Sequence, residues 1–451
     1  MDLSLLLIIL GGMLIRFYNI QQPILEGALR RQTQTAVITR NLLETNFDLF
    51  YPQLHLMPQP YYMILEFPLY NALVAILYKL FGVHEYLGRS VSILFFGGAC
   101  LFLYKLAEKH FGDETGKIAV VCYALSPLSI IFTRSFQPES LMIFLTLSFF
   151  YYFSEWLDKK KVSFLATAWF IGVSLFLVKQ SSMYLIFVAI FMAYLKYGRA
   201  FFLKKDIYFI FTSIIPAILW SLHAKSVHAM HPEIPANVNW NASNWLQFHY
   251  WFDYAFYKGV FETEANLLST PLGFFLFLFG ISLKINNKEE IFFHFWLLAT
   301  IGYYFVLPLH AFTHEYYHLP MVPITSIFIG KCVYRIKRSS VYESSYIKNN
   351  LPLKIMTGVL VILVVFGYAN SAFKIPVKVA SVEEAGNAVN ALTEKDALLI
   401  VSGGHPFSAL YYCQRNGWGF NFHEKYSLEQ MKMIGADKNL EPLAETYIET
   451  L

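Results

Sequence analysis

Charged residues are scarce in this sequence of 451 residues, and long apolar runs take their place. Asp, Glu, Lys and Arg together make up 15% of the chain, whereas 56% of its residues are hydrophobic and 18% are aromatic. Soluble globular domains usually carry about 25% charged residues. The shortage therefore excludes an ordinary soluble protein and predicts that most of the chain lies in a lipid bilayer.

Cysteine is rare as well, with four residues in the chain. Cys100, Cys122 and Cys332 lie in apolar segments, and Cys413 stands alone in the polar C-terminal part. This distribution predicts no disulfide framework and argues against redox chemistry as the function. The first apolar segment has neither a basic leader nor a cleavage site of small residues, so we expect it to be retained as a membrane span.

Apolar segments of about 17 to 25 residues, long enough to cross a bilayer, recur up to about residue 374. We predict eleven spans, at 2–19, 88–106, 117–134, 139–157, 162–178, 182–197, 207–223, 265–283, 290–308, 318–335 and 354–373. A cytoplasmic N-terminus then places four clusters of Lys and Arg in cytoplasmic loops, as the positive-inside rule requires. These clusters are Lys105–Lys117, Lys159–Lys161, Lys196–Lys205 and Arg335–Arg338.

This orientation requires that the apolar segment from Pro68 to Phe81 does not cross the membrane. At about 14 residues the segment is short for a span and suits a helix lying in the membrane interface. Two long segments, 20–87 and 224–264, then face the exterior, and so does the tail from residue 375.

The tail shows a helical pattern at Val382–Leu392, a strand at Ala397–Val401 and a turn at Gly403 and Gly404. We therefore predict an all-α polytopic membrane domain over residues 1–374, with interfacial helices in its first outer loop. A small α/β domain outside the cytoplasm follows it over residues 375–451.

Three carboxylates stand at boundaries of predicted spans or helices on the outer side. Glu26 follows the first span, Glu66 precedes the interfacial helix, and Glu139 opens the fourth span directly after Pro138. Carboxylates at such ends can converge on one pocket. Each also has a structural explanation, because Glu139 suits the first turn of a helix that begins at a proline, and the other two suit solvated loop charges.

Lys179 ends a span on the outer side, where the positive-inside rule disfavours a cation. An anionic lipid phosphate would explain its position, and snorkelling of the side chain into the headgroups is the alternative. Arg31 and Arg134 are further cations at this face.

Three histidines, His310, His314 and His318, lie four residues apart between the ninth and tenth spans. On a helix this spacing would align three imidazoles as metal ligands, but Pro308 and Pro320 favour a loop with interfacial aromatic residues. Both interpretations stay open at this point.

Short motifs occur in a fixed order along nearly the whole chain. They are Leu25-Glu26-Gly27, Arg31-Gln32-Thr33-Gln34-Thr35-Ala36, Arg40-Asn41, Phe67-Pro68-Leu69-Tyr70, Leu80-Phe81-Gly82, Arg89, Tyr316-Tyr317-His318-Leu319-Pro320, and Tyr411 with Arg415-Asn416-Gly417-Trp418. In this order and in their positions relative to the spans, they resemble bacterial membrane glycosyltransferases related to the protein O-mannosyltransferases and the aminoarabinose lipid A transferases. These enzymes belong to the C-type glycosyltransferase (GT-C) superfamily and take sugars from polyprenyl phosphate.

The resemblance implies that Glu26 and Glu139 occupy the two catalytic acidic positions, and that Glu66 matches a further acidic position. The family often has Asp at the first two positions, and Asp carries a carboxylate just as Glu does. A Lys commonly follows the third acidic residue, and this chain has Phe67 there.

The missing Lys leaves three other cations to bind the donor phosphate, namely Lys179, Arg31 and Arg134. A divalent metal ion (Mg²⁺, Mn²⁺ or Zn²⁺), if the reaction uses one, would be held by Glu66 and Glu139. The residues that would line the acceptor pocket are His314, Tyr316 and Tyr317.

We therefore expect an inverting glycosyltransferase that moves a sugar from a polyprenyl-phosphate donor to a lipid, glycan or protein acceptor. Its active site would face the periplasmic or extracellular side of a bacterial inner membrane, with membrane lipids and no nucleic acid as further partners. A secondary transporter, an O-antigen ligase or polymerase, and a non-catalytic polyprenyl-lipid-binding protein are the alternatives. Transporters usually show internal repeats and polar residues near the bilayer midplane, whereas the charges here collect at one face.

Overall fold

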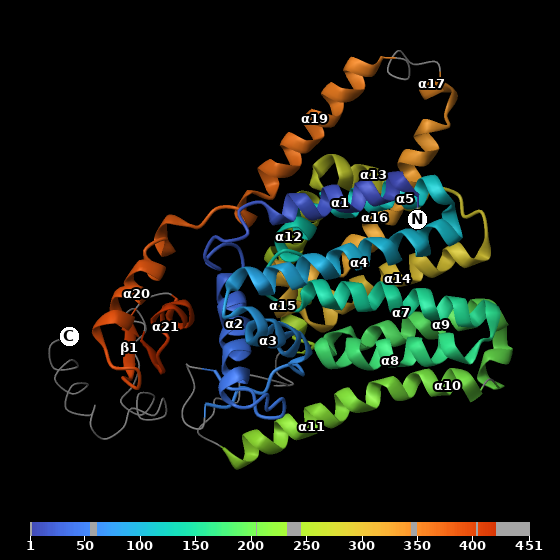
Figure 1. Cartoon of the computed structure of the whole chain (residues 1–451). Coiled ribbons are helices and arrows are strands. Elements are labelled where there is room, and N and C mark those ends of the chain that lie inside the picture. The colour runs from blue at the N-terminus through green and yellow to red at the C-terminus, as the bar shows by residue number, and fades with distance from the viewer. Residues whose placement is uncertain are drawn as a thin grey trace. The chain divides into compact units, whose positions relative to one another are not determined.

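The computed structural model describes residues 2–54, 61–203, 205–231, 245–343, 350–402 and 405–420. These residues are mostly helical, and their one sheet has two short strands (Figure 1). The chain divides into two compact units, each assembled from segments far apart in the sequence. Unit 1 comprises Met1–Gln22, His84–Trp220 and Ala242–Lys374, and unit 2 comprises Pro23–Val83, Ser221–Asn241 and Ile375–Leu451.

Unit 1 consists mainly of apolar helices. In chain order they are α1 (Leu3–Phe17), α4 (Glu85–Phe111), α5 (Asp113–Leu125), α6 (Pro127–Phe132), α7 (Glu139–Lys159), α8 (Val162–Val178), α9 (Leu185–Tyr197), α10 (Lys205–Phe211), α11 (Ile215–Met230, which continues into unit 2), α12 (Tyr254–Thr263), α13 (Thr270–Ser282), α14 (Ile291–Val306), α15 (Pro308–Thr313), α16 (Met321–Lys337), α17 (Ser340–Glu343) and α19 (Leu351–Tyr368). Short 3-10 turns connect several of them, at η1 (Gln180–Tyr184), η2 (Gly198–Leu203), η3 (Thr212–Ile214), η6 (Phe248–Phe252), η8 (Lys288–Glu290), η9 (Glu315–His318) and η10 (Asn370–Ala372), and η7 (Glu264–Leu268) is a π-helical turn.

Among the described residues, five helical stretches are long and apolar enough to cross a membrane, and there are six if one sharply bent pair counts as a span. The five are Glu85–Phe111, Glu139–Lys159, Gln180–Phe201, Asp206–Met230 and Leu351–Tyr368. Each of them overlaps a predicted span. A helical membrane domain is thus confirmed, and the number of eleven spans stays a prediction.

Two predicted spans are interrupted. Pro127 separates α5 from α6 within the predicted span 117–134, because a proline has no N–H to continue the helix. The predicted span 265–283 begins later, at Thr270, since the chain bends by 100° between the helices on either side of Ser269. The two breaks meet, because the Ser126 hydroxyl donates to the Leu268 carbonyl at 2.7 Å.

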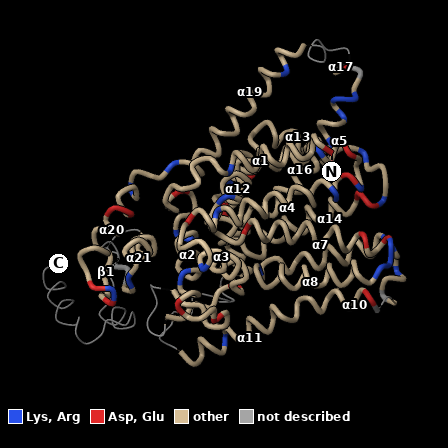
Figure 2. The backbone as a smooth tube through the Cα atoms, viewed as in Figure 1, with Lys and Arg blue, Asp and Glu red and all other residues tan. Residues whose placement is uncertain are grey.

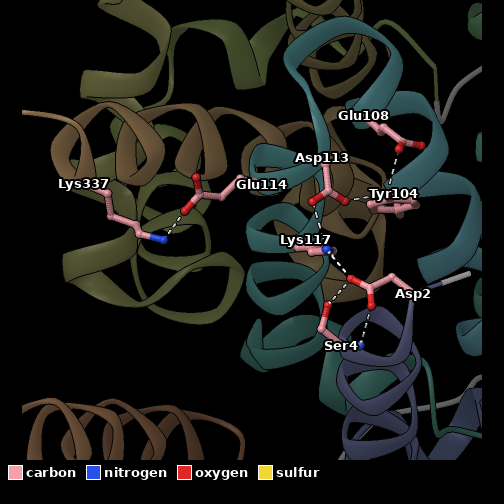
Figure 3. Close-up of polar contacts among 8 residues, drawn as sticks. All are labelled: Asp2, Ser4, Tyr104, Glu108, Asp113, Glu114, Lys117 and Lys337. Carbon is pink, nitrogen blue, oxygen red and sulfur yellow. Dashed lines mark hydrogen bonds and ion pairs between the residues drawn. The ribbon is translucent and has the colours of Figure 1, made fainter. Parts of the chain in front are cut away.

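Charged residues lie mainly at helix ends and connections, and the middle of α7 and α8 carries none (Figure 2). One cluster joins the start of α1, the start of α5 and the end of α16 (Figure 3). Lys117 lies 2.6 Å from Asp2 and 2.9 Å from Asp113, and Lys337 pairs with Glu114. The Lys117 ammonium holds the pKa of the Asp113 carboxyl below its usual range. The structure thus brings together helix ends that the predicted topology places on one side, the cytoplasmic one.

Unit 2 combines the first outer loop with the tail. The loop supplies α2 (Leu29–Glu44) and α3 (Leu69–Phe81), and the tail supplies η11 (Val377–Val379), α20 (Val382–Leu392), α21 (Pro406–Cys413) and the parallel strands β1 (Leu399–Ser402) and β2 (Gly417–Phe420). The predicted helix and strand of the tail, and a helix at the predicted interfacial segment, are therefore present. The predicted turn at Gly403 and Gly404 and residues 421–451 lie outside the described residues.

Contacts between α21 and α2 hold the tail on the first outer loop. The Arg30 guanidinium lies 4.5 Å from the ring centroid of Phe407, and the Arg40 guanidinium lies 4.6 Å from that of Tyr411. Such cation–π contacts contribute about 0.5 to 2 kcal/mol each, depending on solvent exposure. The C-terminal α/β segment is thereby packed against the loop that carries the first motif.

Candidate active site

Glu139 and Lys179 form a buried ion pair in unit 1. Glu139 is the first residue of α7 and Lys179 caps the end of α8, and Lys179 Nζ lies 2.9 Å from Glu139 Oε1. The two side chains are only 1% and 7% exposed. Lys179 therefore points inward to a carboxylate, which argues against snorkelling into the headgroups. The second oxygen of Glu139, Oε2, has no hydrogen-bond partner among the described residues.

The two predicted pocket tyrosines flank this lysine. Lys179 Nζ lies 5.2 Å from the ring centroid of Tyr316 and 5.3 Å from that of Tyr317, within the range of cation–π attraction. The ring of His314 stacks on that of Tyr316, with a centroid distance of 5.3 Å and an angle of 10°. The structure thus brings together Glu139, Lys179 and the three residues predicted to line the acceptor pocket.

The three spaced histidines do not point to a common centre. His310 and His314 stack with their centroids 6.0 Å apart, whereas His318 bonds to Glu264 and to the Ala311 carbonyl. Burial, with smaller effects of His314 and Lys179, lowers the pKa of His310 to about 4, so this ring is neutral at neutral pH. No group of three His, Cys, Asp or Glu in the described part of the chain could hold a metal ion. A loop with stacked aromatic rings is therefore the interpretation that the geometry favours.

Glu26 lies in unit 2, at the turn into α2. Glu26 is only 2% exposed, so its carboxylate is not a solvated loop charge. Its backbone carbonyl accepts a hydrogen bond from Gln32 Nε2 at 2.9 Å, and Gly27 follows with a φ of 51°. Glycine adopts such a positive φ at no steric cost, which explains the glycine in this motif.

Arg31 and Glu66 bind each other in unit 2. Arg31 Nη2 lies 2.8 Å from both carboxylate oxygens of Glu66, and the two side chains are 15% and 23% exposed. A phosphate bound by Arg31, or a metal ion bound by Glu66, would therefore share its ligand with this existing pair. Both roles stay predictions.

Arg134 is completely buried in unit 1, where it stabilises the backbone. Its guanidinium donates to the carbonyls of Arg16 at 3.2 Å, Tyr18 at 3.0 Å and Asn19 at 3.2 Å, and also to the carbonyl of Ala372. A guanidinium has five N–H groups, so these bonds leave at most one for a phosphate. The contacts favour a structural role over the predicted phosphate-binding role.

Sequence reasoning missed residues whose partners are distant in the chain. Glu264 bonds to Tyr304 and His318 in unit 1, and the Tyr412 hydroxyl accepts a hydrogen bond from the Ile24 N–H at 2.9 Å in unit 2. No local pattern distinguishes these residues from their neighbours. Only the packing of the tail on α2 shows that Tyr412 supports the segment just before Glu26.

Removing the Tyr412 hydroxyl tests this support. Tyr412→Phe leaves the completely buried Ile24 N–H without its acceptor, which typically costs about 1 to 3 kcal/mol. We expect a lower melting temperature and a several-fold loss of turnover as the Glu26 segment loosens. Tyr18→Phe removes the hydroxyl of a side chain that is 67% exposed and should change neither quantity. Equal melting temperatures and equal turnover of the two variants would show that Tyr412 gives no such support.

A cavity of about 280 Å³ lies at the opposite end of α7 and is lined by Lys109, Asp158 and Lys196, among others. The ammonium of Lys109 already contacts Ser154 at 2.8 Å, Glu155 at 3.0 Å and Asp158 at 2.6 Å. An ammonium has three N–H groups, so Lys109 has none left for a ligand. The predicted topology places this cavity on the cytoplasmic side, away from Glu139 and Lys179.

Comparison with known proteins supports the resemblance. Residues 60–223 match the family model described as dolichyl-phosphate-mannose-protein mannosyltransferase. The fold is similar to that of ArnT from Cupriavidus metallidurans bound to undecaprenyl phosphate, with a TM-score of 0.64 and 12% identity over 96% of this chain and 88% of that one. It is also similar to the Archaeoglobus fulgidus oligosaccharyltransferase in the apo form, with a TM-score of 0.59 and 12% identity over 92% of this chain.

The present chain spans 64% of the length of the archaeal enzyme. No significant match exists among curated protein sequences. At 12% identity the two solved structures establish the fold, and the family match adds a relation in sequence. Together these findings confirm the resemblance to GT-C glycosyltransferases of the kind represented by the protein mannosyltransferases and ArnT.

Proposed function

We propose that this chain is a membrane glycosyltransferase of the GT-C type and that it transfers a sugar from a polyprenyl-phosphate donor to a lipid, glycan or protein acceptor. The observation that carries the proposal is the buried Lys179, paired with Glu139 and flanked by Tyr316 and Tyr317. A buried cation at the outer end of a span suits an anionic lipid phosphate. The printed descriptions of related structures support this choice, because ArnT was solved with undecaprenyl phosphate and an archaeal oligosaccharyltransferase with dolichol phosphate.

In the proposed reaction the acceptor attacks the anomeric carbon of the donor sugar. A new bond forms between that carbon and the acceptor oxygen or nitrogen, and the bond from the carbon to the phosphate oxygen breaks with inversion. Glu26 takes the proton of the acceptor as general base, and polyprenyl phosphate leaves. Lys179 stabilises the negative charge that develops on the leaving phosphate.

Glu139 has two roles in this proposal. Its Oε1 atom orients the Lys179 ammonium, and its Oε2 atom, which has no partner among the described residues, can accept a hydrogen bond from a hydroxyl of the substrate. A Glu66–Glu139 metal site gains no support from the geometry, since Arg31 already binds Glu66. No step of the proposed reaction depends on a metal ion.

The location that fits this chemistry is the outer face of a bacterial inner membrane. The predicted topology places Lys179 and the loop carrying Tyr316 and Tyr317 on the side opposite the basic loops. A polyprenyl carrier presents its phosphate at the headgroup level of the same face.

Release of polyprenyl phosphate tests the function directly. The purified full-length protein, in lipid nanodiscs, is incubated with a panel of polyprenyl-phosphate-linked sugars and with lipid, glycan and peptide acceptors. We expect one donor to yield free polyprenyl phosphate together with a glycosylated acceptor. A transporter or a non-catalytic binding protein would leave every donor intact, and that result across the panel would refute the proposal.

A further inference from the structure

Glu264 accepts two hydrogen bonds at one carboxylate oxygen inside unit 1. The Tyr304 hydroxyl and the His318 Nδ1 atom each lie 2.7 Å from Glu264 Oε1, and His318 Nε2 lies 2.8 Å from the Ala311 carbonyl. His318 is completely buried and Glu264 is 8% exposed. Because both ring nitrogens of His318 face oxygen atoms, the orientation of the ring is fixed from two sides.

The residues that precede Tyr304 and His318 in the chain carry two aromatic rings that contact each other. Tyr303 precedes Tyr304 in α14, and Tyr317 precedes His318 in η9. The rings of Tyr303 and Tyr317 stack, with centroids 6.2 Å apart and an angle of 13°. The Tyr317 ring in turn lies 5.3 Å from Lys179 Nζ. One carboxylate therefore ties together the two backbone segments whose adjacent residues stack beside this lysine.

Glu264 lies beside a sharp bend of the chain whose backbone is fixed by a hydrogen bond. Glu264 begins the π-helical turn η7, and π-turns occur frequently at functional sites. The chain bends by 100° just after this turn, and the Leu268 carbonyl at the bend is bonded by the Ser126 hydroxyl at 2.7 Å. A carboxylate at such a bend is positioned more rigidly than one on a solvated loop.

We propose that Glu264 and His318 are positioning residues for the polyprenyl-phosphate site, an inference that rests on the proposed function. They do not touch the donor. They hold Tyr316 and Tyr317 against Lys179 and so set where the ammonium meets the donor phosphate. A misplacement of about 1 Å can cost about 100-fold in rate, so a partial loosening of these rings has a measurable effect.

The test uses the full-length protein and undecaprenyl phosphate as the probe lipid. Tyr304→Phe removes one hydrogen bond and keeps the ring, His318→Ala removes the imidazole, and His318→Asn keeps an N–H donor near the position of Nδ1. We expect Tyr304→Phe and His318→Ala to weaken undecaprenyl phosphate binding about 10-fold and to raise the donor KM more than they lower kcat. His318→Asn should recover part of the loss.

A second buried ion pair in unit 1 supplies the matched control. Lys331 Nζ lies 2.8 Å from Glu290 Oε2, and the two side chains are 8% and 1% exposed. Glu290→Gln breaks a pair of the same kind at the cytoplasmic end, so it should lower the melting temperature and leave lipid affinity unchanged.

The outcomes separate the inference from the proposed function. If the parent protein does not bind undecaprenyl phosphate, the proposed donor class is wrong. If the parent binds it and Tyr304→Phe and His318→Ala bind it equally well, the donor class stands and the positioning role is wrong. An equal loss of affinity in Glu290→Gln would attribute the effect to general destabilisation and would also overturn the positioning role.

Discussion

Replacing Glu26 by glutamine is expected to reduce turnover by about 100- to 10,000-fold, the contribution typical of general base catalysis. The substitution keeps the size of the side chain and removes the proton acceptor. Glu26 is 2% exposed in the structure, and its position is fixed by the Gln32 bond to its carbonyl and by the turn at Gly27. Binding of undecaprenyl phosphate should persist, because other residues hold the phosphate.

The measurement is a single-turnover assay of polyprenyl phosphate release, with lipid binding measured in parallel. Glu262→Gln is the control, since the Glu262 side chain is 57% exposed and lies at a long distance of 3.9 Å from Lys258 Nζ. Turnover of Glu26→Gln within a small factor of the parent would move the base to Glu66 or Glu139. Unchanged turnover in Glu66→Gln and Glu139→Gln as well would end the assignment of a carboxylate base.

The sequence predicts the helical membrane domain and places Glu139, Lys179 and Tyr316 at one membrane face, because both inferences depend on local features. Apolar length locates the spans, and the basic loops assign each span end to a side of the membrane. Glu139, Lys179 and Tyr316 then fall at three span ends on the same side, where packing of the helices can bring them together. Their pairing in the structure follows from this shared side.

The structural role of Arg134 could not be predicted from such local features. Its position after a predicted span suggests a cation free to bind phosphate, yet its N–H groups are used by backbone carbonyls, including that of Ala372. Every residue has a backbone carbonyl, so the sequence does not show which carbonyls an arginine will bind. A buried arginine with carbonyl partners therefore looks like a ligand-binding arginine until the backbone path is known.

The contacts between segments distant in the chain could not be predicted from the sequence either. The Ile24 N–H and the Tyr412 hydroxyl are separated by 388 residues, and the Glu264 and His318 side chains by 54. Hydrophobic periodicity indicates which face of an element is buried, but it does not indicate which distant element covers that face. The role of the tail as a support for the first outer loop thus emerged only from the structure.

Substitution of Lys179 is expected to give the largest effect on the donor. Lys179→Met keeps much of the length and apolar character of the side chain and removes the charge. Loss of a charged hydrogen bond to phosphate costs about 1.5 to 3 kcal/mol, which corresponds to about a 10- to 150-fold weaker affinity for undecaprenyl phosphate. The same change leaves Glu139 buried without its cation, and breaking a buried pair in this way typically costs about 3 to 5 kcal/mol of stability.

A double variant separates these two effects. In Lys179→Met/Glu139→Gln a neutral amide replaces the unpaired carboxylate, so the melting temperature should return toward that of the parent while lipid affinity stays low. Lys331→Met, which breaks the buried pair with Glu290 elsewhere in unit 1, should lose stability and keep its affinity for the lipid. Recovery of lipid affinity in the double variant would show that Lys179 acts only as the partner of Glu139. The donor phosphate would then have to be bound by another cation, of which Arg31, released from Glu66, is the first candidate.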